Sequence, residues 1–321
     1  MRTSFVAALV ALSLSACGKK GVLPTAPDSG SGSYTSYTLT IRAARSPKGK
    51  IAGATVVTDD SRSFATDSSG VVPLSASDVG RTVYITANGY TGPSIIIFRP
   101  IGQGMTHYLL PDDAMMPYAW IRTAFYGDSD AQWLWRPMPG RLDVELSGEG
   151  WADHRISDAL AWGSRITNSA QHHVIFNVVP AGQTGTVKMY ADSNDPIFSA
   201  PGYENAWAVT FLTVRGPVVV GARIVWKVFL DDANSAMPEH IGKAMAHELG
   251  HVTGIEGHPC CGIMGSADPL LDFSQQEKDA FDYLFLRPPG TRPPDNLAAA
   301  PQMAASSGGR RQEVVVCVLH R

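Results

Sequence analysis

The sequence has few charged residues, few cysteines and no surplus of basic residues, and each of these absences narrows what the protein can do. Lys and Arg number 26 against 29 Asp and Glu, so the formal net charge is −3 at pH 7. Nucleic-acid binding normally shows as clustered positive charge, so this balance argues against nucleic acid and against an electrostatically bound membrane surface. No basic run with interleaved aromatic residues occurs either. Hydrophobic residues form 44% and charged residues 17% of the 321 residues, which is typical of a globular protein with a core.

Long hydrophobic runs are also lacking, apart from a short one at the N-terminus. Residues 1–16, MRTSFVAALVALSLSA, combine Arg2 with a short apolar stretch and small final residues, which is typical of a signal peptide and too short for a membrane-spanning helix. Leu14 to Cys17 resembles a bacterial lipobox, which implies cleavage before Cys17 and lipidation of its thiol. Gly18, in place of aspartate after that cysteine, implies the outer membrane. We therefore expect an exported outer-membrane lipoprotein on the periplasmic or cell-surface face; the alternative is an ordinary cleaved signal with an incidental cysteine.

Only four cysteines occur, and the lipid accounts for Cys17. Cys260, Cys261 and Cys317 remain, in a compartment that permits disulfides. This odd set leaves at least one free thiol or an intermolecular bond. Adjacent cysteines rarely pair with each other, so either one of them pairs with Cys317 or both stay reduced.

The rest of the chain divides by composition into four parts. Residues 17–35 carry the lipidated cysteine and a flexible tether rich in Gly, Ser and Pro. Residues 36–112 alternate short apolar runs with turn residues, which predicts a small antiparallel β-sandwich. Residues 117–286 mix strand and helix patterns, which predicts an α+β domain. Residues 287–321 have little to bury and predict a disordered tail, although residues 314–320 also fit an edge strand.

The expected elements follow from apolar periodicity and turn signals. In the first folded part the expected strands are residues 37–44, 54–58, 81–87 and 94–100. In the second part the expected strands are residues 141–147, 172–180, 185–191, 207–214 and 217–231. Helices are expected at residues 152–170, from Pro238 onward, and at 274–285, where Ser274 and Glu277 form a capping box.

Three short stretches of the first folded part resemble the carboxypeptidase-regulatory-like sandwich modules of secreted proteins. They are residues 53–56, 66–70 and 89–90. The segment shows no chemistry of its own, since its one histidine, His107, stands alone. The resemblance implies a spacer or adhesion module.

The chemistry of the sequence lies in residues 247–265, HELGHVTGIEGHPCCGIMG. His247 and His251 stand four apart, on one face of a helix, so both rings can reach one metal ion. Glu248 points about 100° away around that helix and can act on a water without displacing a ligand. Zinc held in this way lowers the pKa of the water and polarises a carbonyl, while the glutamate takes the proton.

The residues that follow resemble the metzincin metalloproteases, the clan that includes matrixins and astacins, whose pattern is HExxHxxGxxH followed by a methionine turn. Four residues fall in register with that pattern: His247, Glu248, His251 and Gly254. Ile263-Met264 looks like the methionine turn, with Met264 as structural support beneath the metal. The resemblance covers about half the chain, residues 117–286. It implies a mixed sheet with an active-site helix and a C-terminal helix, one catalytic zinc, and zinc-dependent endopeptidase activity with Glu248 as general base.

The third metal ligand departs from the clan's pattern. The clan places it three residues after the glycine, where this chain has Gly257, and His258 comes one residue later. A one-residue insertion in the turn delivers His258 to the metal, and Gly257 makes that turn easy. Other candidates stay open: Glu256, Cys260, Cys261 and, in a different class of zinc protease, Glu277.

The resemblance also implies a peptide or protein substrate. Metzincins bind substrate as an extended strand along an edge strand above the metal, which we expect within residues 203–220. Many matrixins are kept latent by a propeptide cysteine, but residues 18–246 contain no cysteine, so any regulation works otherwise. His172 and His173 are expected to be core or surface histidines, and additional structural calcium or zinc is left open. The alternative function is a non-catalytic surface-binding lipoprotein that keeps a protease-like scaffold.

Overall fold

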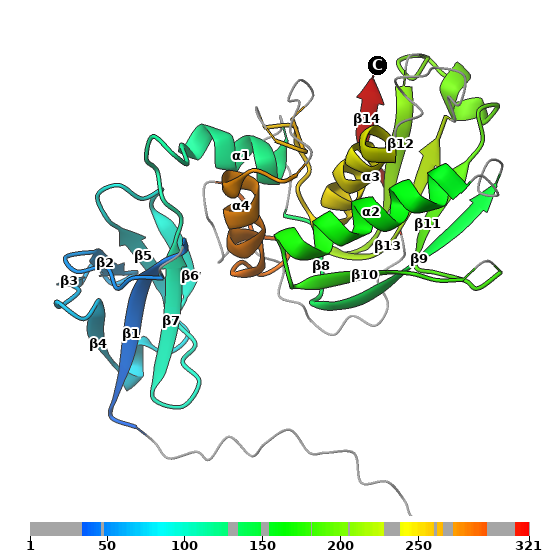
Figure 1. Cartoon of the computed structure of the whole chain (residues 1–321). Helices are drawn as coiled ribbons and strands as arrows, with labels where there is room; N and C mark the ends of the chain where they lie inside the picture. The colour runs from blue at the N-terminus through cyan, green and yellow to red at the C-terminus, as the bar shows by residue number, and fades with distance from the viewer. Residues whose placement is uncertain are drawn as a thin grey trace, which may run out of the picture. The chain divides into compact units, whose positions relative to one another are not determined.

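The structure is a computed structural model, and it describes ten stretches of the chain. They are residues 34–45, 48–127, 134–148, 154–180, 182–204, 206–227, 238–259, 262–265, 272–293 and 312–320. These stretches form a mixed α/β fold with several sheets and few helices, and they belong to one compact unit (Figure 1). The expected signal peptide, Cys17, Cys260 and Cys261 lie outside the described residues. No helix among the described residues is long and apolar enough to cross a membrane.

Two small sheets form the N-terminal part of the unit. One has the order β4–β1–β7, and the other the order β3–β2–β5–β6. Their bounds are β1 (Ser36–Ala43), β2 (Thr55–Thr58), β3 (Ser63–Ala65), β4 (Val71–Ser75), β5 (Thr82–Thr86), β6 (Ser94–Ile97) and β7 (Gly104–Leu109), with a short 3₁₀-helix, η1 (Ala76–Asp78), after β4. Apolar residues from both sheets meet in one buried cluster, because their strands alternate buried and exposed side chains.

One detail of these sheets corrects the sequence prediction of a wholly antiparallel sandwich. β1 and β7 pair in parallel, with Leu39 opposite Met105 and Ile41 opposite His107. Parallel neighbours need a long connection, and here the chain builds the whole four-stranded sheet between them. Sequence alternation reports which face of a strand is buried but carries no information on strand direction.

A larger mixed sheet forms the second part, with the order β10–β9–β11–β13–β12–β14 and β8 beside β13. Its strands are β8 (Arg136–Pro137), β9 (Gly140–Gly148), β10 (Val174–Val178), β11 (Val187–Ala191), β12 (Ala206–Arg215), β13 (Val218–Trp226) and β14 (Gln312–His320). β9, β10, β11 and β13 run parallel, whereas β12 runs antiparallel to β13 and β14 runs antiparallel to β12.

Two long helices pack against this sheet. α2 (His154–Ala170) connects the parallel strands β9 and β10, and α3 (Pro238–Thr253) lies beside it (Figure 1). Leu160 of α2 and Leu249 of α3 enter the same buried cluster as Val144, Met189 and Ile224 of the sheet. The long crossover through α2 is what parallel pairing of β9 and β10 requires.

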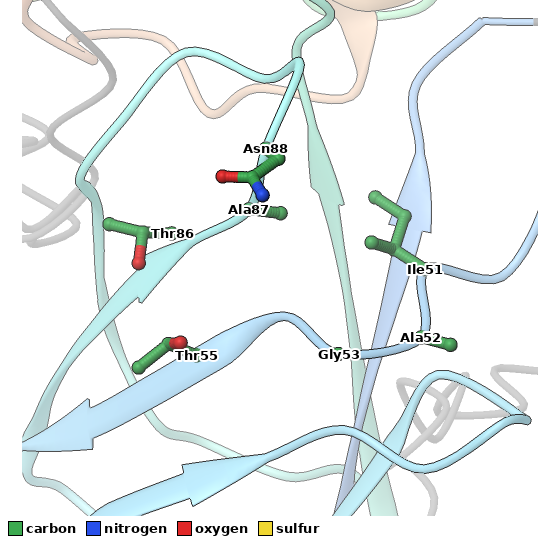
Figure 2. Close-up of a pocket in the computed structure, with 7 residues that line it drawn as sticks. All are labelled: Ile51, Ala52, Gly53, Thr55, Thr86, Ala87 and Asn88. Atoms are coloured by element: carbon green, nitrogen blue, oxygen red, sulfur yellow. The ribbon is translucent and has the colours of Figure 1, made fainter.

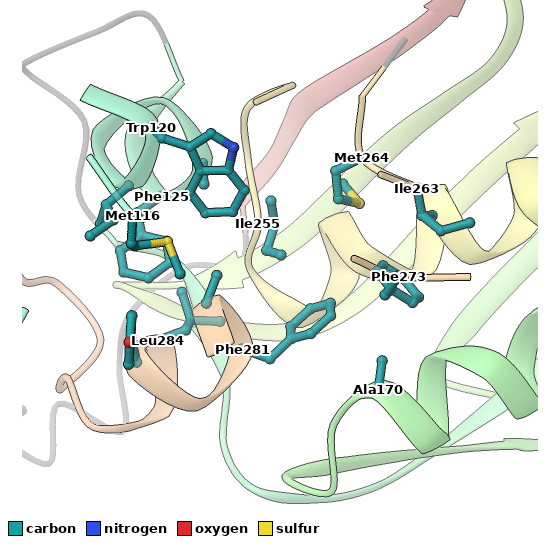
Figure 3. Packing of buried hydrophobic residues seen from close by; sticks show 14 of the residues in the cluster. Met116, Trp120, Phe125, Ala170, Ile255, Ile263, Met264, Phe273, Phe281 and Leu284 are labelled. Carbon is teal, nitrogen blue, oxygen red and sulfur yellow. The ribbon is translucent and has the colours of Figure 1, made fainter. Parts of the chain in front are cut away.

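Two shorter helices, α1 (Tyr118–Tyr126) and α4 (Gln275–Phe285), pack together on a second buried cluster, and a short 3₁₀-helix, η2 (Pro196–Ser199), precedes β12. The sequence did not predict α1. The predicted capping box of α4 is confirmed: Glu277 N donates to Ser274 Oγ at 3.2 Å, and Ser274 N donates to Glu277 Oε2 at 2.6 Å. Figure 3 shows this cluster, in which Ile255 and Met264 lie with Phe273 and Phe281.

The predicted disordered tail needs correction at both of its described stretches. Arg287 is buried, and its backbone oxygen accepts hydrogen bonds from Arg136 Nε at 2.9 Å and Nη2 at 2.8 Å. Residues 312–320 form β14, so the edge-strand alternative for residues 314–320 fits the structure. Strand-rich apolar segments gain backbone pairing when a free sheet edge is within reach, which composition alone does not reveal.

Candidate metal centre

α3 carries the first part of the candidate site between two cores. Met245, Leu249 and Val252 face the large sheet, and Ala246 faces the cluster of α1 and α4. With both of these faces fixed by packing, the helix cannot rotate about its axis without exposing apolar surface. His247, Glu248 and His251 are therefore held in a defined direction, and all three are buried.

Gly254 ends α3 and turns the chain back. Its φ is +120°, in the region that favours glycine, and a Cβ there would lie 2.7 Å from the carbonyl oxygen of Trp135. Its N–H reaches Gly250 O at 3.1 Å and His251 O at 3.0 Å, and Ile255 N reaches Gly250 O at 3.2 Å. These bonds satisfy carbonyls that the helix end would otherwise leave without partners.

The end of α1 supports the turn that follows. The carbonyl of Ala124 accepts hydrogen bonds from Glu256 N at 2.9 Å and from Gly257 N at 3.2 Å. A Cβ on Gly257 would lie only 1.9 Å from the carbonyl oxygen of Thr123. Residue 257 must therefore be glycine for the turn to pack on α1, and the next residue, His258, comes back over α3.

Three imidazole rings meet at this point. One ring nitrogen from each of His247, His251 and His258 lies within 4.8 Å of the other two. The ring centroids of His258 lie 5.1 Å from those of both His247 and His251. His247 and His251 are buried, whereas His258 is exposed, so one side of the cluster faces solvent.

Backbone carbonyls fix the direction of the two buried rings. His247 Nδ1 lies 2.8 Å from Ile263 O, and His251 Nδ1 lies 2.6 Å from Ile255 O. A carbonyl only accepts, so each Nδ1 carries the proton and each Nε2 presents a lone pair. The outer hydrogen bond of a metal-ligating histidine commonly does this.

The two lone pairs face one another, and this arrangement suits a cation. His247 Nε2 and His251 Nε2 are 3.0 Å apart. Burial, with the neighbouring His258, lowers the pKa of His247 to about 3, and burial, with its histidine neighbours, lowers the pKa of His251 well below its usual value. Both rings are thus neutral near pH 7, and an ion that accepts their lone pairs relieves the repulsion between them. Neutral imidazole nitrogens are ligands that zinc prefers, so the donor set fits that metal.

Glu248 lies beside the histidines on α3. Its carboxylate is fully buried, and Oε2 accepts a hydrogen bond from the Thr210 hydroxyl on β12. Oε1 has no hydrogen-bond partner among the described residues. Burial raises the pKa of Glu248 to about 8 against the opposing effect of the Thr210 hydrogen bond. Thr210 thus holds one oxygen of the Glu248 carboxyl group, and a cation bound at the histidines would lower the pKa of Glu248 toward the carboxylate form that a general base needs.

The loop of Ile263 and Met264 forms the floor of the site. Ile263 supplies the carbonyl that orients His247, and Met264 Sδ lies 2.4 Å from the position that a Cβ on Gly250 would take. Glycine at position 250, inside the motif, thus lets the thioether lie against α3. Glu277 of α4 holds the loop from the other side, since its Oε1 accepts from Met264 N at 2.6 Å.

The other candidate ligands lie elsewhere or outside the described residues. Glu256 is buried and does not belong to the group of ring nitrogens, and its Oε1 accepts from Trp135 N at 3.3 Å. Glu277 binds the loop backbone and its own helix cap. Among the described residues, the only group of this kind that could hold a metal consists of His247, His251 and His258.

Two further histidine positions show no metal-site geometry. His173 stacks on Phe285 with ring centroids 4.4 Å apart, and its Nε2 lies 3.0 Å from Asp282 Oδ1. His107, the histidine for which the sequence suggested no chemistry, is buried, and its Nε2 lies 2.7 Å from Ser94 Oγ. Each pair joins elements of the fold.

A shallow cleft of about 290 Å³ lies in the N-terminal part, far along the chain from α3 (Figure 2). It is lined by Ile51, Ala52, Gly53, Thr55, Thr86, Ala87 and Asn88. None of these side chains titrates near neutral pH or ligates metal readily, so the cleft offers no catalytic group.

Three supporting residues were not found from the sequence. Thr210 is a polar residue inside the apolar run WAVTFLTV, a signal that can be read only once its strand is known to lie beside α3. Gly250 is a costly residue within a helix, which is a signal of close packing. Ala124 acts through its backbone carbonyl, and no side-chain pattern reports that role.

The prediction of a free strand edge within residues 203–220 is wrong for β12. β12 pairs with β13 on one side and with β14 on the other. The position beside β12 is thus taken by the chain's own C-terminal segment.

No protein-family model and no curated protein matches this chain.

Proposed function

We propose that this protein is a zinc-dependent endopeptidase of the metzincin kind, with His247, His251 and His258 as zinc ligands and Glu248 as general base. The observation that carries the proposal is the meeting of three imidazole nitrogens within 4.8 Å beside a buried glutamate, one of whose oxygens has no hydrogen-bond partner in the described part of the chain. Bound zinc supplies an activated water and polarises a carbonyl group. The mixed sheet, the helix that carries the motif and the helix after it are compatible with this proposal.

The residues of the chain divide the remaining tasks. Ile263 O and Ile255 O orient two ligands through their Nδ1 protons, and the turn held by α1 brings in the third. Glu248 Oε1 accepts a proton and later returns it to the leaving amine, while Thr210 holds Oε2 in place. Met264 supports the ring of ligands from below.

The other parts of the chain are assigned by their sequence. We assign the two N-terminal sheets to a separate spacer or adhesion module of the carboxypeptidase-regulatory-like kind, and Cys17 to lipidation at the outer membrane. A palmitate-labelling experiment on the Cys17→Ser variant tests the anchor. Retained label in that variant would contradict the assignment.

The catalytic proposal is tested with the wild type and the Glu248→Ala variant, both assayed for zinc content and for cleavage of casein and of peptide libraries. We expect both to hold zinc and the variant to lose activity on the order of 10²-fold or more, since a positioned general base contributes that much. Glu145→Ala, the same substitution on β9, is the matched control and should retain activity. Zinc binding with equal inertness of wild type and variant favours the alternative, a surface-binding lipoprotein with a protease-like scaffold.

A further inference from the structure

β12 is the strand that connects the large sheet to the candidate base, and both of its edges are occupied. β13 pairs with one edge and β14 with the other, although β14 lies about a hundred positions further along the chain. Figure 1 shows β14, in red, beside β12 and close to α3. The outer edge of β12 is therefore closed by the last described segment of the chain.

The register places β14 beside the position of β12 that contacts the candidate base. Cys317 stands opposite Thr210, and the Thr210 hydroxyl donates to Glu248. Val318 stands opposite Val209, and Val315 opposite Phe211. The backbone of β14 thus pairs with β12 at Thr210, the residue of β12 that contacts the proposed general base.

A second extended peptide cannot share this edge. Each strand edge offers one row of backbone N–H and C=O groups, and these groups pair with one neighbour at a time. An extended peptide that adds to β12 in antiparallel register would use the groups that β14 uses. β-strand addition of this kind is a common way for proteins to bind extended peptides.

The pairing of β14 is interrupted close to the site. The register shifts between Thr210 and Phe211, where Val316 is the extra residue on β14, and again between Ala206 and Ala208. Such irregularities break the hydrogen-bond ladder locally and occur often next to functional sites. β14 is thus held by separate short ladders, which are easier to displace than one continuous ladder.

We propose that β14 is a built-in competitor of the substrate: it occupies the β12 edge on which an extended peptide must lie to be cleaved. This inference depends on the function proposed above for the same site. The substrate class that follows is an extended, unfolded segment, because only such a chain pairs with β12. The uncharged run VVVCVL in β14 indicates that the edge accepts aliphatic sequences.

The first experiment weakens β14 within the full chain. The Val314→Pro/Val315→Pro double variant is suitable because the N–H groups of successive strand residues point in alternate directions. One of the two prolines therefore replaces a residue whose N–H faces β12 and removes a hydrogen bond to that strand. Val318→Pro/Leu319→Pro, on the other side of the irregularity, is a second variant in case the first fails to fold. Ala304→Pro/Ala305→Pro is the matched control outside the strand. Circular dichroism and zinc content show whether each variant is folded.

We expect the strand variants to cleave extended peptides with a KM lower by about tenfold, because the apparent affinity rises with the fraction of molecules whose edge is open. The control should behave as wild type. A folded, zinc-loaded strand variant with an unchanged KM would overturn the proposal.

The second experiment needs no cleavage. A fluorescent peptide with the sequence of residues 312–320, and serine in place of cysteine, is titrated into the same chains carrying Glu248→Ala. We expect it to bind the strand variants at least about tenfold more tightly than the control, for the same reason of edge occupancy. Equal binding to both would overturn the competitor role. Selective binding to the strand variants, together with no cleavage by the corresponding chains that keep Glu248, would support the occupied edge while contradicting only the catalytic proposal.

Discussion

Glu277 accepts a hydrogen bond from the backbone N–H of Met264 at 2.6 Å, and this contact joins α4 to the loop beneath the candidate metal centre. Its other oxygen accepts from Ser274 N at 2.6 Å and from Ser274 Oγ at 2.9 Å. The residue before Met264, Ile263, supplies the carbonyl that orients His247. The Glu277 carboxylate at the start of α4 thus helps to fix the His247 ring on α3, because Met264 and Ile263 connect the two contacts.

Glu277→Gln tests this connection. The amide places a donor where the carboxylate faces only donors, so at least one buried group loses its partner at a cost of about 1–3 kcal/mol. We expect a lower melting temperature and a zinc affinity reduced by about 10–100-fold, the range for a group that supports a ligand from outside. Asp279→Asn, the same chemical change at a half-buried position of α4, should change neither. Equal effects of the two variants would mean that Glu277 acts only on the general stability of the helix.

Thr210→Val tests the orientation of the proposed base. Valine keeps the shape of threonine but removes the hydroxyl that donates to Glu248. We expect normal zinc content and a kcat lowered by about 10-fold or more, since a hydrogen bond to a charged group contributes about 1.5–3 kcal/mol. Steady-state kinetics with one peptide substrate measures the effect. A loss of zinc in this variant would instead place Thr210 among the residues that shape the metal site.

A Cβ at Gly257 would clash with backbone and a Cβ at Gly250 with a side chain, so the two alanine variants should differ in zinc affinity. At Gly257 a Cβ would lie 1.9 Å from the backbone oxygen of Thr123, whereas at Gly250 it would lie 2.4 Å from the flexible side chain of Met264. A side chain can rotate away, but the end of α1 cannot move without losing its packing. We expect Gly257→Ala to lose zinc affinity by at least about tenfold, because a loop shift displaces a ligand. Gly250→Ala should keep more of its affinity; the opposite order in a zinc titration would contradict the role assigned to α1.

Asp78 is a buried carboxylate from which we expect an acid response of the N-terminal sheets. Its side chain is fully buried and accepts from Ser75 N and Ser75 Oγ at 2.7 Å each and from Arg62. Burial alone would raise the pKa of Asp78, but the bonds from Arg62 and Ser75 outweigh it and hold the pKa below its usual value. The stabilisation is therefore present above the unfolded pKa, near 4, and is lost as the pH falls through the lower folded value.

Asp78→Asn should remove this dependence together with about 1–3 kcal/mol of stability at neutral pH, because the Arg62 and Ser75 donors lose a charged acceptor. Thermal unfolding between about pH 7 and pH 3 measures both effects, since carboxylates protonate in that interval. Asp59→Asn, at an exposed position of the same sheets, is the control. A parallel pH profile for wild type and Asp78→Asn would show that other carboxylates govern the acid response.

The parts of the fold that depend on local signals were predictable from the sequence. The i, i+4 spacing of His247 and His251 and the capping box at Ser274 each act within one helix, so residue types and spacing were sufficient. The strands around α2 were likewise read from their periodicity. The expected positions agree with the observed elements to within a few residues, apart from residues 228–231, which lie outside the description.

The parts that depend on distant contacts were not predictable. Thr210 and Glu248 are 38 positions apart, and their contact exists only because the sheet brings β12 beside α3. The extra residue before His258 is accommodated by a backbone carbonyl of α1, a helix whose pattern was not recognised. β14 pairs with β12 although most of the second part of the chain lies between them in sequence. The composition around β14 fitted disorder as well as a strand.

His258 is proposed to complete the candidate metal centre, and zinc affinity tests this role most directly. Competition titration with a zinc chelator should be performed on wild type, His258→Ala and Glu256→Gln. We expect His258→Ala to lose affinity by on the order of 10²-fold or more, since it removes a ligand, whereas Glu256→Gln changes only a group that contacts Trp135 N. If Glu256→Gln loses zinc while His258→Ala retains it, the assignment of the third ligand is wrong.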